Sequence, residues 1–165
     1  MRDSRKLTPV PEKRIDPQHQ TQVQRLLTLR KFPGLADAEL GELAIIAENV
    51  VEQTFPAGAV VASATRRAPG EKHRSQMMNP TGPALHLMIS GKLVTASGNH
   101  WGPHEVCGAL QAMAGKRTSE DIVAEQETHT LRLSAANFRE ILEDNFGLLS
   151  AVRRTLAREL LNLAL

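Results

Sequence analysis

Aromatic side chains are scarce in this 165-residue chain, which has four phenylalanines, one tryptophan and no tyrosine. The hydrophobic core must therefore be built mainly from aliphatic side chains. Proteins that bind single-stranded nucleic acid stack the bases on aromatic rings. So few rings argue against that class of function.

Cysteine is almost absent, because Cys107 is the only one. A single cysteine excludes a disulfide within the chain and is typical of a reducing compartment. No stretch approaches the roughly 20 apolar residues that a membrane-spanning helix needs. The N-terminus also lacks the apolar segment of a secretory signal. These absences predict a cytoplasmic protein without a membrane segment.

Positive charge is concentrated at the N-terminal end. Residues 1–31 contain eight Lys and Arg against three Asp and Glu, whereas the rest of the chain has twelve against fifteen. Residues 1–20 also hold three prolines and few apolar side chains, so burial cannot repay the entropy of ordering them. We predict a disordered basic leader at 1–20 and one domain at 21–165. The leader either contacts a phosphate backbone or an acidic partner, or is only solvated.

Helical periodicity appears first in residues 21–50. A helix is predicted from Thr21, and the apolar and long side chains at helical spacing are Val23, Leu26, Leu27 and Arg30. In the next helix Asp37 is the expected N-cap. The predicted inward stripe of that helix is Leu40, Leu43, Ala44 and Ala47.

The period changes to that of strands in the middle of the chain. Two short strands are predicted around a Pro-Ala-Gly turn at 56–58, and two more around Ser90 and Gly91. Residues 119–134 read as another pair, and its predicted inward residues are Ile122, Ala124, Leu131 and Leu133. Residues 66–83 form a long charged loop insertion, and loops above about 12–15 residues are usually functional or disordered.

The C-terminal part is helical again. Ser134 is the expected N-cap of a helix with Phe138, Ile141 and Leu142 on one face. A terminal helix follows at 145–165, and its broad apolar face is Leu148, Leu149, Val152, Leu156, Leu160 and Leu163. Helices, then strands, then helices predict an α+β fold built on an antiparallel β core.

Four segments in this order resemble the cyclic-nucleotide-binding domain of catabolite-activator-type regulators, protein kinase A regulatory subunits and cyclic-nucleotide-gated channels. They are residues 35–40 (LADAEL), 55–61 (FPAGAVV), 87–93 (LMISGKL) and 101–110 (WGPHEVCGAL). They look like the family's opening helix, first hairpin, Ser-Gly strand turn and approach to the phosphate cassette. The resemblance spans about residues 27–163. It implies an antiparallel β-roll of eight strands (a jelly roll, or double-stranded β-helix), flanked by N-terminal helices and two C-terminal helices.

The family's ligand site implies which residues would bind a cyclic phosphate here. It uses N–H groups at the start of a short helix, a Gly-Glu pair whose carboxylate binds the ribose, and an arginine about ten residues after the glycine. Helix N-termini and arginine forks both suit phosphate. The corresponding positions in this chain are Gly108, Ala109, Leu110, Arg117, Thr118 and Ser119.

The chain departs from that pattern at several of these positions. Ala109 leaves the carboxylate position empty, and Arg117 lies one residue too early. Glu120 and Asp121 follow closely, and carboxylates repel a phosphate. His104 stands where the family usually has glycine. A lost charge-assisted hydrogen bond costs about 1.5–3 kcal/mol, so we expect lost or weakened binding of cAMP and cGMP and no cofactor.

Other interpretations of the same stretch compete with a ligand site. Lys116 and Arg117 serve a phosphate if the turn is one residue shorter, and are otherwise a solvated pair. His100 and His104 lie four apart in a Gly-Pro loop. A third metal ligand would have to come from Glu105, Cys107 or His86. This arrangement has no recognised zinc spacing, so no metal site is predicted.

No catalytic residues are predicted. The sequence has no Gly-rich phosphate loop, and its Ser, His, Asp and Cys residues do not follow the order of a known hydrolase. Cys107 is expected to pack as a small buried hydrophobe, with a redox role as the alternative.

The terminal helix bears on the choice of partner. Its leucine-rich seam has near-heptad spacing and is formed by Leu149, Val152, Leu156, Leu160 and Leu163. The seam either forms a homodimer or packs on its own β-roll. No helix-turn-helix follows in the sequence, so a transcription factor acting alone is not expected.

The sequence therefore favours a non-enzymatic regulatory module that binds a protein partner through the leader, the 66–83 loop or the terminal helix. A genuine receptor for a cyclic nucleotide or another phosphorylated small molecule is one alternative. A structural component of a larger assembly is the other.

Overall fold

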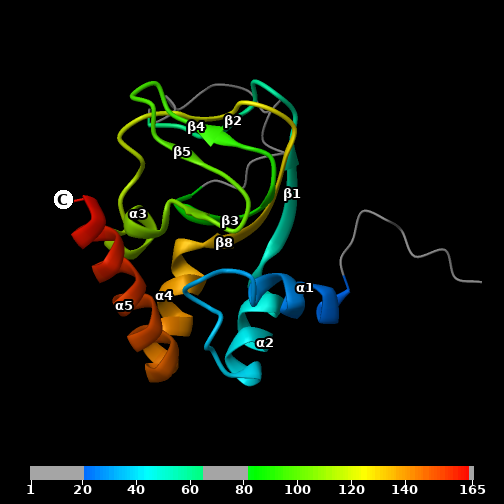
Figure 1. The fold of residues 1–165 in the computed structure, drawn as a ribbon, viewed down its shortest axis with the longest axis vertical. Coiled ribbons are helices and arrows are strands. Elements are labelled where there is room, and N and C mark those ends of the chain that lie inside the picture. The colour runs from blue at the N-terminus through cyan, green and yellow to red at the C-terminus, as the bar shows by residue number, and fades with distance from the viewer. Residues whose placement is uncertain (1–20, 65–81, 164–165) are drawn as a thin grey trace, which may run out of the picture.

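The computed structural model describes residues 21–64 and 82–163. Within these ranges it has two four-stranded antiparallel sheets with helices before and after them (Figure 1). The helices are α1 (Gln22–Leu29), α2 (Leu40–Asn49), α3 (Ala109–Ala114), α4 (Ala135–Asp144) and α5 (Phe146–Leu163). The strands are β1 (Val51–Phe55), β2 (Val60–Ala62), β3 (Ala84–Ser90), β4 (Leu93–Val94), β5 (His100–Trp101), β6 (Val106–Cys107), β7 (Ile122–Ala124) and β8 (Thr128–Ser134). The leader predicted at 1–20 and most of the 66–83 loop lie outside the described residues.

The strands alternate between the two sheets along much of the chain. One sheet has the order β1-β8-β3-β6 and the other β2-β7-β4-β5. The hairpin expected around residues 56–58 is therefore wrong, because β1 pairs with β8 and β2 pairs with β7. The Pro-Ala-Gly turn is a corner between the sheets, anchored where the N–H of Gly58 donates to the carbonyl of Ala124. The predicted α+β fold with an antiparallel β-roll is confirmed.

Strands β3 and β8 divide the core into two clusters, because successive side chains of a strand point to opposite faces. On the outer face of their sheet, Leu85, Leu87, Leu131 and Leu133 pack with the helices. The cluster between the two sheets is smaller and consists of Phe55, Val61, Met88, Leu93, Cys107, Ile122 and Ala124. The four inward positions predicted for β7 and β8 are all buried.

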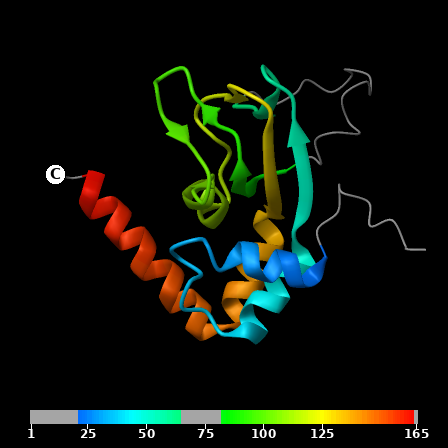
Figure 2. The same ribbon diagram turned by 45° about the vertical axis from the view of Figure 1, so that its right-hand side comes forward.

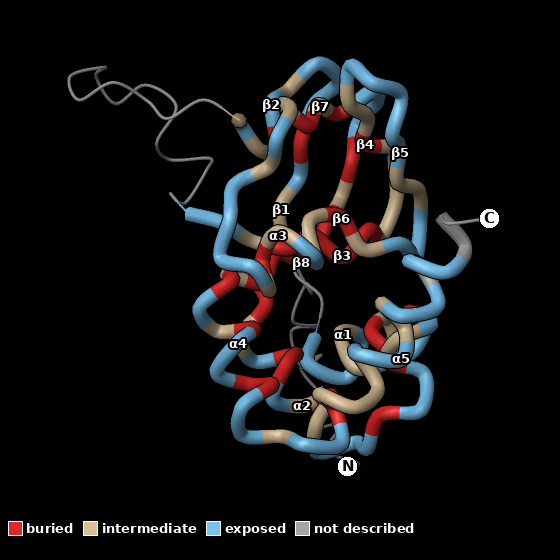
Figure 3. Tube along the Cα trace, turned by 90° about the vertical axis from the view of Figure 1, so that its left-hand side faces the viewer, coloured by how far each residue is buried: buried red, intermediate tan, exposed pale blue. Residues whose placement is uncertain are grey.

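The N-terminal and C-terminal helices lie together at one end of the roll (Figures 1 and 2). Their shared cluster joins Leu29, Phe32 and Leu43 to Phe138 and Leu148. Buried segments run through α2, α4 and β3, whereas the turns at the far end of the roll are exposed (Figure 3). From this cluster α5 runs obliquely alongside the roll (Figure 2).

The start of α2 differs from the prediction. Its N-cap is Glu39, whose N–H donates to the Glu42 carboxylate at 2.9 Å. Asp37 lies exposed in the preceding turns, so its predicted capping role is wrong. Leu40, predicted inward, is 60% exposed because it is the first residue of the helix. The buried residues of α2 are Leu43, Ile46 and Ala47.

The starts of α1 and α4 agree with the sequence. Thr21 and Ser134 cap them by accepting from N–H groups three residues ahead. In α1, however, only Leu29 is buried, and Val23 and Leu27 are exposed. The helix packs mainly on α2, so one side of it stays uncovered. None of the described helices is long and apolar enough to span a bilayer.

Candidate functional site

The predicted ligand-binding segment begins at a glycine that the backbone requires. Gly108 precedes α3 with a φ of 83°, a conformation that glycine adopts at little cost. A Cβ at this position would lie 2.9 Å from the carbonyl oxygen of Ala84. Only glycine therefore allows β6 to turn into α3 so close to β3.

The first turn of α3 presents backbone N–H groups that have no partner inside the helix. The first bond within the turn runs from the N–H of Ala112 to the carbonyl of Gly108 at 2.9 Å. Free N–H groups at a helix start favour an anion. The side chains add no polar group here, since Ala109 carries only a methyl group and Leu110 is 43% exposed.

The other predicted ligand residues follow α3 in a loop. Arg117 and Ser119 are exposed, and within residues 21–64 and 82–163 neither side chain has a hydrogen bond or ion pair. Thr118 is half-buried. Its hydroxyl oxygen is buried and finds no hydrogen-bond partner among the described residues. An unsatisfied buried hydroxyl is costly.

The two carboxylates after this loop are bonded to neighbouring turns. Glu120 accepts from the Ser97 hydroxyl in the turn between β4 and β5. Asp121 accepts from the Ser63 hydroxyl at 3.0 Å and from the N–H of Ala64 at 2.8 Å. Both carboxylates therefore tie the α3–β7 loop to turns of the β2-β7-β4-β5 sheet.

The loop between β5 and β6 shows why the family favours glycine at position 104. His104 has a φ of 67°, a value that glycine tolerates better than histidine. Its N–H donates to the Met88 carbonyl, and its ring meets Phe32 edge-on with 6.1 Å between centroids. The Glu105 carboxylate accepts from the N–H of Gly102.

The histidines and the cysteine of this region do not converge. Among the described residues no group of three His, Cys, Asp or Glu side chains could hold a metal ion. His86 lies inside the roll, where its Nδ1 is 3.2 Å from the Thr130 hydroxyl. Burial, followed by the positive charge of Arg132, lowers the pKa of His86 to about 4. Burial also raises the pKa of the Cys107 thiol to about 12, and the prediction that Cys107 is a buried hydrophobe is confirmed.

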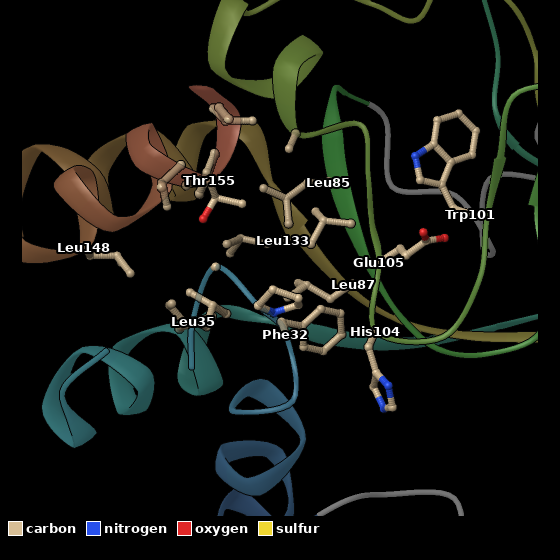
Figure 4. Close-up of a pocket in the computed structure, with 18 of the residues that line it drawn as sticks. Phe32, Leu35, Leu85, Leu87, Trp101, His104, Glu105, Leu133, Leu148 and Thr155 are labelled. Atoms are coloured by element: carbon tan, nitrogen blue, oxygen red, sulfur yellow. The ribbon is translucent and has the colours of Figure 1, made fainter. Parts of the chain in front are cut away.

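Two features were missed from the sequence. The first is the buried polar row on the inner face of the β1-β8-β3-β6 sheet, which includes His86, Thr130 and Arg132. The alternation of polar and apolar residues in 128–134 (THTLRLS) was the signal that could have found it. The second is a cavity of about 530 Å³ between α5 and the outer face of that sheet (Figure 4). The residues that line this cavity come from distant parts of the chain, so no local sequence pattern indicates it.

Comparisons with known proteins find relatives by structure alone. No protein-family model matches the chain. No curated protein sequence matches it either. Many solved structures do match.

Three of these structures illustrate the likeness. A mutant regulatory subunit of a cAMP-independent protein kinase A from Trypanosoma brucei, bound to cAMP in its A site, is 18% identical over 81% of this chain and 46% of its own, with a TM-score of 0.60. The N-terminal domain of a transcriptional regulator from Streptomyces coelicolor A3(2) is 19% identical over 83% and 92%, with a TM-score of 0.59. The catabolite activator protein of Thermus thermophilus is 18% identical over 80% and 60%, with a TM-score of 0.58.

These matches establish the fold. The chain has the cyclic-nucleotide-binding fold that its sequence resembles. It spans about half the length of the protein kinase A regulatory chains that it matches, with 44–50% of each covered.

Proposed function

We propose that this cyclic-nucleotide-binding fold serves as a non-enzymatic regulatory module that binds a protein partner and has lost or weakened its affinity for cyclic nucleotides. The supporting observation is the first residue of α3. Ala109 offers a methyl group where the family's ribose-binding carboxylate would stand. A missing charge-assisted hydrogen bond of this kind is worth about 1.5–3 kcal/mol, or roughly ten- to hundredfold in affinity.

Arg117 also contributes to the proposed loss of affinity for cyclic nucleotides. Its side chain is exposed and makes no hydrogen bond or ion pair with the described residues. A ligand would therefore have to order a long, mobile side chain, which costs about 0.5–1.5 kcal/mol. This cost further lowers the affinity that the remaining N–H groups can supply.

Thermal unfolding with cAMP and with cGMP tests the proposal. At about 1 mM ligand we expect the Tm to rise by less than about 2 °C, because ligand binding stabilises a protein only in proportion to ln(1 + [L]/Kd). The variant Ala109→Glu restores the carboxylate and should respond more strongly than the wild type. A rise of more than about 5 °C in the wild type, lost in Arg117→Ala, would contradict the proposal.

The buried Thr118 hydroxyl favours a second candidate, a receptor for a phosphorylated small molecule. The hydroxyl lies next to Arg117 in the chain and has no hydrogen-bond partner among the described residues. Thr118→Val keeps the shape and removes the hydroxyl. A receptor that uses this group should lose its ligand-induced Tm shift in Thr118→Val, whereas a module without ligand affinity should give the same small response in both proteins.

The C-terminal part of α5, around the exposed Leu160 and Leu161, is the surface that we propose for the protein partner. Two of the five predicted seam residues serve the protein's own core, since Leu149 and Val152 pack against the helix cluster. Further along, Leu160 and Leu161 are 54% and 66% exposed, and the Leu163 side chain lies outside the described part. Leucines spaced three and four residues apart, as Leu156, Leu160 and Leu163 are, pair readily with a second copy of the same helix.

The molar mass of the protein in solution tests whether α5 forms a dimer through this surface. We expect a dimer by light scattering at tens of micromolar protein, and a monomer for Leu160→Lys, because a charge in an apolar seam is costly to bury. Leu27→Lys is the matched control, since Leu27 is an equally exposed leucine on α1, and it should remain dimeric. A monomeric wild type would refute self-association through α5.

A further inference from the structure

The cavity beside α5 lies on the opposite side of the β1-β8-β3-β6 sheet from the interior of the roll. Leu85, Leu87 and Leu133 point into it from β3 and β8, and α5 closes the other side (Figure 4). Of the six predicted cyclic-nucleotide positions, Ala109 lines the cavity, and the other five do not: Gly108, Leu110, Arg117, Thr118 and Ser119. The cavity therefore meets the predicted cyclic-phosphate segment at Ala109 and otherwise lies apart from it.

The position of α5 explains why this space is not filled. The helix is anchored at its start by Leu148, which is 1% exposed. Further along it meets the turn after α1, where a Cβ on Gly34 would lie 3.2 Å from the Thr155 hydroxyl. Between the anchored helix and the sheet, Val152 and Leu156 face a gap of about 530 Å³. Ligand pockets in proteins typically measure about 300–1,000 Å³ and are mostly apolar.

Most polar side chains of the cavity lie on one side. His100, Trp101, His104 and Glu105 come from β5 and the loop after it, Thr155 comes from α5, and the rest of the wall is mostly apolar (Figure 4). The hydrogen bond from the N–H of Gly102 holds the Glu105 carboxylate next to the peptide that follows Trp101. Glu105 is the only Asp, Glu, Lys or Arg residue among the described residues that line the cavity.

We propose that this cavity binds a small amphiphilic organic cation, with its hydrocarbon body among the leucines and its ammonium head at Trp101 and Glu105. An aromatic face and a carboxylate both attract an ammonium group. The hydrocarbon body gains about 25 cal/mol for each Å² of apolar surface removed from water. An anionic head would meet the Glu105 carboxylate without a compensating Lys or Arg in the wall.

Fluorescence of N-phenyl-1-naphthylamine, a neutral dye that brightens in apolar sites, reports occupancy. The dye should bind saturably. Of the three competitors, decylammonium should displace it at the lowest concentration, decanol at a higher one and decanoate at the highest. All three competitors share one chain, so the order reports the head group alone. Glu105→Gln should weaken the binding of decylammonium by about three- to fivefold, the usual strength of an exposed charge pair, and leave the binding of decanol unchanged.

A neighbouring pair of variants locates the binding. Leu156→Trp fills the cavity and should abolish the dye signal, whereas Ala157→Trp, on the exposed side of the same turn, should retain it. Far-UV circular dichroism confirms that both fold. The proposal is overturned if the dye does not bind saturably, if Leu156→Trp binds it as the wild type does, or if decanoate displaces it as tightly as decylammonium.

Discussion

At the scale of single residues, the inner face of β3 and β8 carries polar side chains deep in the protein. Thr130 and Thr128 are fully buried, and His86 and Arg132 are 4% and 9% exposed. His86 and Arg132 are cross-strand neighbours, and Arg132 donates to the carbonyl of Gly82 at 3.4 Å. The His86 ring also meets Phe55 edge-on. His86 is therefore held neutral, packed and hydrogen-bonded.

Stability should fall with acid because of His86. Its pKa is about 4 in the folded protein and 6.5 when unperturbed. Between these values the unfolded chain binds more protons, so the free energy of unfolding decreases as pH falls from 6.5 to 4, by about 3 kcal/mol. Above pH 6.5 this contribution is fully present and constant.

Urea unfolding at a series of pH values measures this effect as a difference between proteins. His86→Gln removes the titrating group, and its stability should fall less than that of the wild type between pH 6.5 and 4. His129→Gln makes the same substitution at a half-exposed histidine of β8 and controls for the substitution itself. Parallel slopes for the wild type and His86→Gln would show that His86 is not the group responsible.

At the scale of elements, the turn between β3 and β4 depends on a glycine. The sequence correctly places a turn at Ser90 and Gly91, but the expected pairing of the two strands is wrong, because β3 and β4 lie in different sheets. Gly91 has a φ of 91°. A Cβ on Gly91 would overlap the backbone and side chain of Thr128. The turn therefore has both a conformational and a steric requirement for glycine.

Gly91→Ala should lower the free energy of unfolding by about 3 kcal/mol or more, since backbone strain and overlap add. Gly58→Ala is the matched control, because Gly58 has a φ of 84° with nothing within 4 Å of its Cβ position. That control should lose only the strain of the left-handed conformation, about 1–2 kcal/mol. Equal losses in urea unfolding would mean that contact with Thr128 contributes nothing.

At the scale of the whole molecule, one sheet joins the two clusters of the core. Its outer face packs with helices from both ends of the chain, and its inner face packs with the second sheet. Leu148 is buried in the helix cluster, whereas the only tryptophan, Trp101, packs against the cluster between the sheets. Because they share β3 and β8, the helices and the roll should unfold as one unit.

Leu148→Ala tests this coupling. It should cost about 2–5 kcal/mol, as large-to-small changes in a core do, and shift the Trp101 fluorescence and helical dichroism transitions by the same amount. Leu160→Ala, on the exposed end of α5, should cost less than about 0.5 kcal/mol. Separate transitions in Leu148→Ala would mean that the helices and the roll are independent.

The sequence alone determined the features that depend on residues close together in the chain. The helix start at Thr21, the cap at Ser134, the turn at Gly91, the alternation in β7 and β8, and the burial of Cys107 depend on neighbours along the chain or on side-chain type. The order of helices and strands, with the segments that resemble the cyclic-nucleotide-binding family, predicted the fold. The absence of a carboxylate at Ala109 likewise follows from the residue type alone.

Only the tertiary structure decided which distant segments meet. It placed β1 and β2 in different sheets, exposed Leu40 and Val23, buried the Thr118 hydroxyl and left a cavity between α5 and the outer face of β3 and β8. A periodic pattern states that one face of an element is apolar, but burial depends on what packs against that face. Those contacts come from residues far apart in the chain, so no local pattern contains them.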